Sequence, residues 1–131
     1  MEYDAAIIGL GYVGLSTAIC FASRGIKVLG IDIDQKKVQK IRTGKSPIFE
    51  KNMPILLKKV VKNGKLNVQS NYDEICKSKI IFLAVGTPSN NNGSINLKYI
   101  KAAIKHIGLS IKKSNENFLI CLFFYAIINL T

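Results

Sequence analysis

The sequence has little arginine, and this absence limits what its strong positive charge means. Its 131 residues include 17 lysines but only two arginines, and the net charge is +11. Surfaces that read nucleic-acid bases depend on the bidentate arginine fork, often with aromatic side chains beside it. The lysines here are scattered from Lys27 to Lys113 and form no such cluster. We therefore interpret the charge as a solvated lysine surface and expect no nucleic-acid partner.

Cysteine is also scarce. The three cysteines, Cys20, Cys76 and Cys121, are odd in number and lack the spacing of metal ligands. This pattern is typical of a reduced interior, so a cytoplasmic location is expected and no metal site is predicted. We expect all three to act as small apolar residues inside packed elements.

No apolar run is long enough to cross a membrane. The longest covers residues 118–128, eleven residues against the roughly 18 that a span needs. Glu2 and Asp4 stand where a signal peptide would carry basic residues, so no membrane partner is expected. The length predicts one globular domain.

Short apolar segments alternate with amphipathic ones along the whole chain. Strands are expected at residues 4–8, 27–31, 66–69 and 79–85, with another opening near residue 117. Helices are expected at residues 13–23, 35–42 and 54–62, and a further one after Asn96. Alternation of strand and helix predicts an α/β fold with a parallel sheet.

A glycine-rich segment, Gly9-Leu10-Gly11-Tyr12-Val13-Gly14, lies between the first strand and the first helix. In a dinucleotide-binding turn, Gly9 permits the tight turn, Gly11 leaves room for a pyrophosphate, and Gly14 lets the helix pack closely. Asp32 follows the next strand at about the 20-residue spacing that this arrangement needs. The alternative is a glycine-rich join that binds nothing.

The position of Asp32 predicts which dinucleotide would bind. Its carboxylate would accept hydrogen bonds from the adenosine ribose and repel a 2′-phosphate, so NAD is favoured over NADP. The amide groups of the helix N-terminus favour the phosphates. His106 is isolated among lysines, and we interpret it as a surface or half-buried residue without a catalytic role.

Several segments together resemble the UDP-glucose/GDP-mannose dehydrogenase family in its N-terminal NAD-binding domain. They are "GLGYVGL" at residues 9–15, "AVGTP" at 84–88 and "GSINL" at 93–97, in family order and spacing. The resemblance covers roughly residues 3–113. It implies a Rossmann-type doubly wound parallel sheet, and an enzyme of polysaccharide biosynthesis that oxidises the C6 alcohol of a nucleotide sugar, such as a UDP-sugar, to a carboxylate with two NAD.

The resemblance also assigns residues to the cofactor. It implies that the pyrophosphate is lined by Gly9, Gly11, Tyr12, Val13 and Gly14, that Asp32 and Lys37 contact the adenosine end, and that Thr87 also contacts NAD.

The end of the chain departs from the family pattern. Relatives continue into segments with a catalytic glutamate, a dimerisation domain and a cysteine nucleophile, and Cys121 does not match that cysteine. We therefore predict a Rossmann domain at residues 1–117, truncated at its C-terminal side, an off-pattern apolar tail at 118–131, and no catalytic residues. One interpretation is a truncated or frameshifted piece of a nucleotide-sugar 6-dehydrogenase, inactive by itself. The other is a stand-alone NAD-binding module without catalysis, and the off-pattern tail favours the first.

Overall fold

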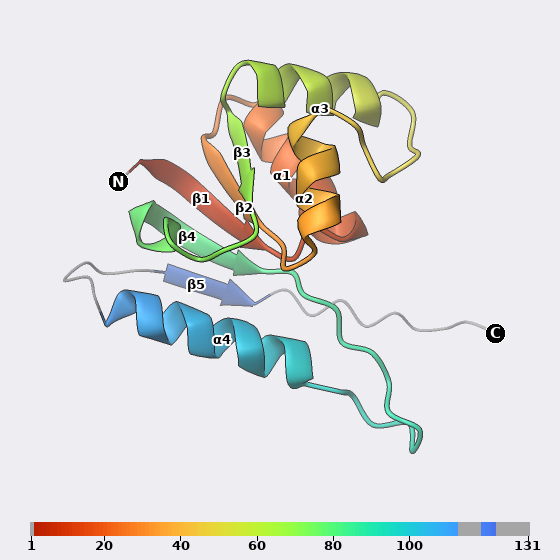
Figure 1. Cartoon of the computed structure of the whole chain (residues 1–131), viewed down its shortest axis with the longest axis vertical. Helices are drawn as coiled ribbons and strands as arrows, with labels where there is room; N and C mark the ends of the chain where they lie inside the picture. Colours follow the sequence, from red (N-terminus) through yellow and green to blue (C-terminus); the bar gives the residue numbers. More distant parts are fainter. Residues whose placement is uncertain (1, 113–118, 123–131) are drawn as a thin grey trace.

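A five-stranded parallel sheet is the centre of the computed structural model, which describes residues 2–112 and 119–122 (Figure 1). The strand order is β3-β2-β1-β4-β5. The strands are β1 (Tyr3–Ile8), β2 (Val28–Ile31), β3 (Leu66–Gln69), β4 (Ser78–Leu83) and β5 (Leu119–Leu122). The helices are α1 (Tyr12–Ser23), α2 (Gln35–Arg42), α3 (Met53–Lys62), the short 3₁₀ helix η1 (Ile75–Lys77) and α4 (Lys98–Ile111).

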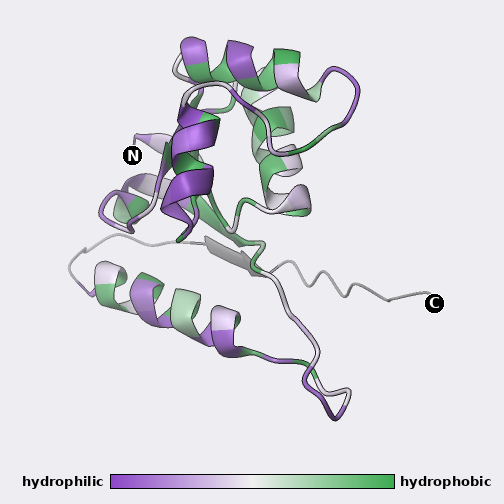
Figure 2. Ribbon diagram, turned by 45° about the vertical axis from the view of Figure 1, so that its right-hand side comes forward, coloured by the Kyte–Doolittle hydropathy of each residue, from purple (hydrophilic) through white to green (hydrophobic). Residues whose placement is uncertain are grey.

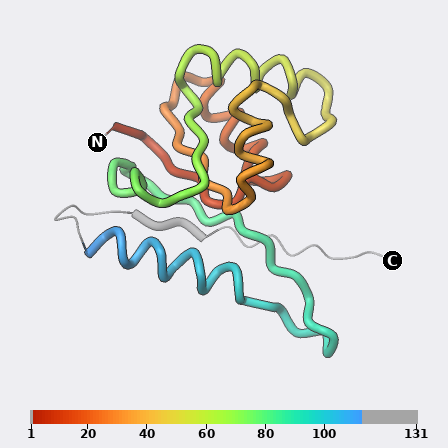
Figure 3. Tube along the Cα trace, viewed as in Figure 1, coloured from red at the N-terminus to blue at the C-terminus, as the bar shows by residue number. Residues whose placement is uncertain are grey.

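The direction in which the chain crosses the sheet changes at β1. The chain first builds outward from β1 to β2 and β3, and then returns to place β4 on the other side of β1 (Figure 3). Helices α1, α2 and α3 lie on one side of the sheet and α4 lies on the other (Figure 1). The arrangement is the doubly wound α/β fold, and it leaves a crevice at the carboxyl ends of the strands beside β1.

Each face of the sheet buries its own apolar cluster. Ile7 points into the cluster that includes Leu15 and Leu57, while its neighbour Ile8 points into the cluster with Ile107. Successive residues of a strand face opposite sides, so a strand covered on both sides must be apolar throughout. Figure 2 shows hydrophilic stretches alternating with hydrophobic ones along the helices.

The buried face of α1 leaves out Cys20, which was expected to be packed inside. The structure instead buries Gly14, Leu15, Ala18, Ile19 and Ala22. Gly14 must lie against the glycine turn, which sets the rotation of the helix and turns Cys20 to solvent. The prediction that Cys20 is packed inside was therefore wrong. Cys76 is half-buried, and its thiol donates a hydrogen bond to the Ser110 carbonyl oxygen at 3.0 Å.

The strand expected near residue 117 is present as β5, which pairs in parallel with β4 from Ile80–Leu119 to Leu83–Leu122. Four residues of the segment interpreted as a tail thus belong to the sheet. Residues 118 and 123–131 lie outside the described residues, and the boundary at 117 stays a prediction. None of the described helices has the length and apolarity needed to cross a membrane.

Candidate functional site

A cavity of about 540 Å³ opens at the carboxyl ends of β1, β2 and β4, in the crevice where the strand order changes direction. Its walls come from the glycine turn, the end of β2, the segment after β4 and one face of α4. The lining residues are Ile8, Gly9, Gly11, Tyr12, Val13, Ile31, Asp32, Ile33, Lys37, Tyr72, Ala84, Val85, Gly86, Tyr99, Ala102, Ala103 and His106. Most of these are apolar or glycine, so each polar group in the set is conspicuous.

The glycine turn is built by close contacts that exclude any side chain. Gly9 has a φ of 93°, and a Cβ there would lie 2.7 Å from the Ala84 carbonyl oxygen. A Cβ on Gly14 would overlap the Gly9 carbonyl oxygen, so α1 packs directly on the turn. Around Gly11, in contrast, no described residue other than its immediate chain neighbours has an atom within 4 Å of the position that a Cβ would take. The turn is tightly packed at Gly9 and Gly14 and open at Gly11, which lines the cavity.

The N-terminus of α1 meets the cavity without a capping side chain. Its N-cap residue is Gly11, and no side chain of the described residues accepts a hydrogen bond from the first turn. The first amide groups of a helix carry partial positive charge and lack partners within the helix. They offer donors to an anion in the cavity.

Asp32 places a carboxylate beside the glycine turn in the same cavity. The residue is only 8% exposed. Its Oδ2 accepts hydrogen bonds from the Leu10 amide at 2.8 Å and from Lys37 Nζ at 2.9 Å, and its Oδ1 accepts one from the Asp34 amide at 2.9 Å. Asp34 in turn caps α2 by accepting from the Lys36 and Lys37 amides, which positions the Lys37 side chain.

Two aromatic rings form the wall next to Asp32. Tyr72 and His106 stack with centroids 4.8 Å apart and an interplanar angle of 11°. Burial, and secondarily the charge of Asp32, raises the pKa of Tyr72 above its ordinary value, so its phenol is neutral at physiological pH.

The structure brings together six of the eight predicted cofactor residues. The cavity is lined by Gly9, Gly11, Tyr12, Val13, Asp32 and Lys37. Gly14 is buried behind the turn, and Thr87 is half-buried just beyond the lining residue Gly86. Within the described residues, no group of histidine, cysteine and carboxylate side chains could hold a metal ion.

Sequence reasoning missed the wall formed by Tyr72 and α4. Tyr99, Ala102, Ala103 and His106 follow one another at helical spacing on one face of α4, and that periodicity was the available signal. His106 is exposed, as expected, but its partner Tyr72 is 34 residues earlier in the sequence. No local pattern connects the two.

The sequence matches the family described as "UDP-glucose/GDP-mannose dehydrogenase family, NAD binding domain" over residues 3–121. A GDP-mannose 6-dehydrogenase from Pseudomonas aeruginosa is 38% identical over 112 residues, which are 85% of this chain and 26% of that protein. A UDP-glucose 6-dehydrogenase from Bacillus subtilis is 41% identical over 111 residues, 84% of this chain and 25% of that protein. The chain thus spans about a quarter of the length of the curated relatives it matches.

Solved structures agree with the sequence matches. A ternary complex of GDP-mannose dehydrogenase from Pseudomonas aeruginosa superposes with a TM-score of 0.88 at 35% identity, covering 91% of this chain and 28% of that one. A UDP-glucose dehydrogenase from Pyrobaculum islandicum gives a TM-score of 0.86 at 30% identity, covering 93% and 28%.

Proposed function

Because the chain belongs to the UDP-glucose/GDP-mannose dehydrogenase family and corresponds to its NAD-binding domain, we propose that the cavity beside β1 is where NAD binds. The observation that carries this proposal is the pairing of two unlike polar features within one apolar cavity. They are the uncapped N-terminus of α1 and the buried carboxylate of Asp32. Pyrophosphate and ribose are the two polar parts of NAD that such features recognise.

We assign the pyrophosphate to the first turn of α1. The open space at Gly11 permits the phosphates to approach the backbone, and the Tyr12 and Val13 amides supply donors. Gly9 and Gly14 act indirectly, because their lack of side chains holds the turn in the shape that exposes those amides. Thr87, beyond the lining residue Gly86, completes the proposed set on the β4 side.

We assign the adenosine ribose to Asp32. Each carboxylate oxygen accepts about two hydrogen bonds, and Oδ1 of Asp32 has one donor within the described residues, the Asp34 amide. A ribose hydroxyl supplies the next donor. A 2′-phosphate in the same place would bring two anions together, so we propose that NAD binds more tightly than NADP. Lys37, hydrogen-bonded to the same carboxylate, holds its orientation.

We further propose that the chain serves the oxidation of a nucleotide-sugar C6 alcohol to a carboxylate with two NAD. The support is family membership and the names of the relatives, which act on GDP-mannose and UDP-glucose. The second oxidation requires a nucleophile that holds the aldehyde. Neither Cys20 nor Cys76 lines the cavity, and we assign no catalytic role to any described residue. The free thiols of Cys20 and Cys76 support a cytoplasmic location.

Calorimetric titration with NAD and NADP tests the cofactor assignment. Asp32→Ala is expected to weaken NAD binding about ten- to a hundredfold, because it removes a hydrogen bond to a charged group. Asp4→Ala, which removes a carboxylate at the far edge of the sheet, is the matched control and should leave the affinity unchanged. Equal affinity of the natural chain for NAD and NADP, or equal binding by the Asp32 variant, would contradict the assignment.

Absorbance of NADH tests the assignment of no catalytic residues. With UDP-glucose or GDP-mannose as substrate, the chain is expected to bind NAD without steady reduction of it. Sustained turnover that disappears in Asp32→Ala would show that the chain carries catalytic groups of its own.

A further inference from the structure

We propose that the stacked rings of Tyr72 and His106 are the wall on which the adenine base of NAD rests, with His106 as the residue that determines affinity for the base. The inference rests on the proposed function and extends it to a part of the cavity that lies outside the predicted cofactor residues. A dinucleotide presents one flat aromatic base at this end, and a flat aromatic wall suits it.

The two rings lie at the adenosine end of the cavity. Tyr72 and Asp32 line the same cavity, and the charge of Asp32 contributes to the raised pKa of the Tyr72 phenol, in keeping with a ring near the carboxylate assigned to the ribose. The base is bonded directly to that ribose, so it must lie within one sugar of Asp32. Ile33, which follows Asp32 and is 69% exposed, lines the same cavity and offers an apolar surface at this end.

One ring of the wall packs against the core, and the other is exposed at the cavity. Tyr72 packs against the buried cluster that contains Ile75 and Ile107, so its ring is fixed by the core. His106 lies on that ring and is exposed at the rim of the cavity. Next to it on α4, Ala102 and Ala103 present only methyl groups, which leaves space for a planar ligand.

The polar atoms of Tyr72 and His106 are available for hydrogen bonds to a ligand. Among residues 2–112, no hydrogen bond joins the Tyr72 hydroxyl or the His106 imidazole to another side chain or to the backbone. A histidine that only fastened α4 to the segment before η1 would be expected to use its ring nitrogens for that purpose. Stacking alone leaves both the ring face and the nitrogens available to a ligand, and aromatic stacking is a common way to hold a base.

Proton NMR of the intact chain tests this directly, because His106 is the single histidine of the sequence and its ring protons need no assignment. Adding NAD or ADP-ribose is expected to shift the His106 Hε1 and Hδ2 resonances through the ring current of adenine. Nicotinamide mononucleotide, which has no adenine, is expected to leave them in place. If calorimetry shows that NAD binds while both resonances stay fixed, this inference is overturned and the proposed function stands.

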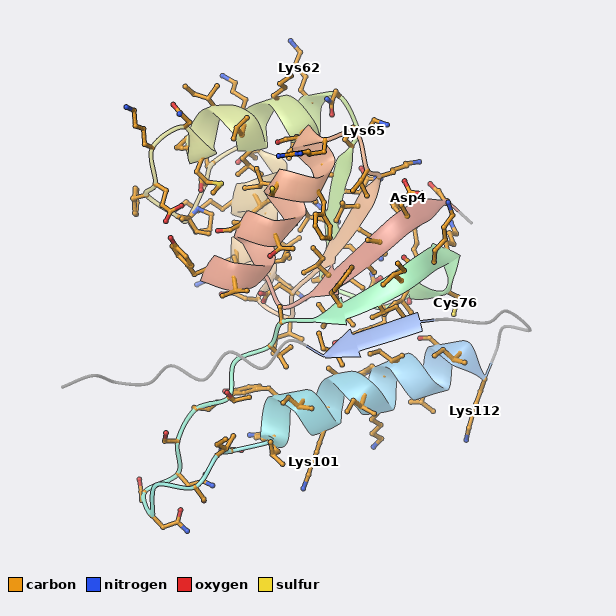
Figure 4. The ribbon with its side chains drawn as sticks, turned by 180° about the vertical axis from the view of Figure 1, so that it is seen from behind. Asp4, Lys62, Lys65, Cys76, Lys101 and Lys112 are labelled. Carbon is orange, nitrogen blue, oxygen red and sulfur yellow. The ribbon has the colours of Figure 1, made fainter. Side chains whose placement is uncertain are left out.

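Substitutions separate a binding role from a structural one. His106→Ala is expected to weaken NAD and ADP-ribose about five- to tenfold, the lower part of the range for one lost base stack. His106→Phe restores a flat ring and should bind within about twofold of the natural chain. Lys101→Ala is the matched control, since Lys101 lies on the same helix and points away from the sheet (Figure 4).

The melting temperature of each variant provides the second measurement. A His106→Ala chain that melts earlier but binds NAD with unchanged affinity would overturn the inference, because the stack would then serve only the fold. Failure of the natural chain to bind NAD at all would instead overturn the proposed function together with this inference.

Discussion

An aspartate–lysine pair lies at each end of the strands, one at the carboxyl edge where the strands finish and one at the amino edge where they start. The two pairs differ far more in burial than in the distance between their charged atoms. Asp32 and Lys37 lie 2.9 Å apart at the carboxyl edge, and Asp4 and Lys79 lie 2.8 Å apart at the amino edge. The Asp32 side chain is 9% exposed, whereas that of Asp4 is 45% exposed. Figure 4 shows Asp4 at the start of β1, at the end of the sheet remote from the cavity.

The amino edge is a surface network of ion pairs. Lys77 contacts both Glu2 and Glu74, and the Tyr3 hydroxyl donates to Glu74 at 2.8 Å. These charges have opposite-charge partners and are exposed to solvent. At the carboxyl edge, one carboxylate stands in an apolar hollow and is held by two backbone amides and one lysine. The two aspartate–lysine pairs have similar N–O distances but contribute differently to stability. A buried charge costs more free energy to leave unpaired than an exposed one.

The largest loss of stability is expected from adding a side chain where α1 packs against the glycine turn. Gly14→Ala places a methyl group on the Gly9 carbonyl oxygen, so α1 must move away from β1. We expect the free energy of unfolding to fall by about 3 kcal/mol or more, measured by urea denaturation.

Gly11→Ala is the matched control on the open side of the same turn. Its methyl group meets no described residue beyond its chain neighbours, so stability should change by less than about 0.5 kcal/mol. The methyl would occupy the place proposed for the pyrophosphate, and NAD affinity should fall at least about tenfold. Equal stability of the Gly14 and Gly11 variants would show that the close packing of α1 on the turn is not required.

A smaller effect is expected from breaking the two lysine–aspartate pairs in the same way. Lys37→Met keeps the side-chain stem but leaves Asp32 buried with only its backbone donors, at an expected cost of about 1–2 kcal/mol of stability. Lys79→Met removes an exposed partner and should cost less than about 0.5 kcal/mol. Urea denaturation at neutral pH measures both. A loss from Lys79→Met as large as that from Lys37→Met would refute the contrast between the edges.

Most of the fold could be predicted because local patterns specify it. The bounds of α2 and β3 agree with the sequence, since polar caps and turn residues flank their apolar positions. The end of β4 was expected at Val85, but the strand ends at Leu83. The ladder stops there because its neighbour β1 ends at Ile8, and Ala84 and Val85 line the cavity instead.

The candidate site was predictable only where its residues follow one another in a motif. The glycine turn and Asp32 have fixed spacing along the chain, because one strand and one helix separate them. Tyr72 and His106 come from segments that meet only after η1 and α4 pack on the same face of the sheet. The exposure of Cys20 on α1 was missed for a related reason, since apolar residues surround that helix and give it no distinct face in the sequence.

The smallest effect concerns the exposed pair and its response to acid. The hydrogen bond from Lys79, and then that from the Lys27 amide, hold the pKa of Asp4 below its ordinary value. A carboxylate whose pKa is lower in the folded state binds protons more readily when unfolded, so its contribution is present at neutral pH and is lost as the pH falls.

Asp4→Asn should therefore be slightly less stable than the natural chain from about pH 5 to pH 7, and the difference should shrink below about pH 4, where the natural chain loses the same interaction. Urea midpoints at pH 3 and pH 7 measure this. Glu74→Gln should behave alike, because the Tyr3 hydroxyl, and then Lys77, lower the pKa of Glu74. A difference between Asp4→Asn and the natural chain that grows toward pH 3 would show that the ionised form of Asp4 is not the stabilising one. Asp4 would then contribute to stability through packing rather than charge. The difference in stability between the exposed pair and the buried Asp32–Lys37 pair could no longer be attributed to the burial of charge.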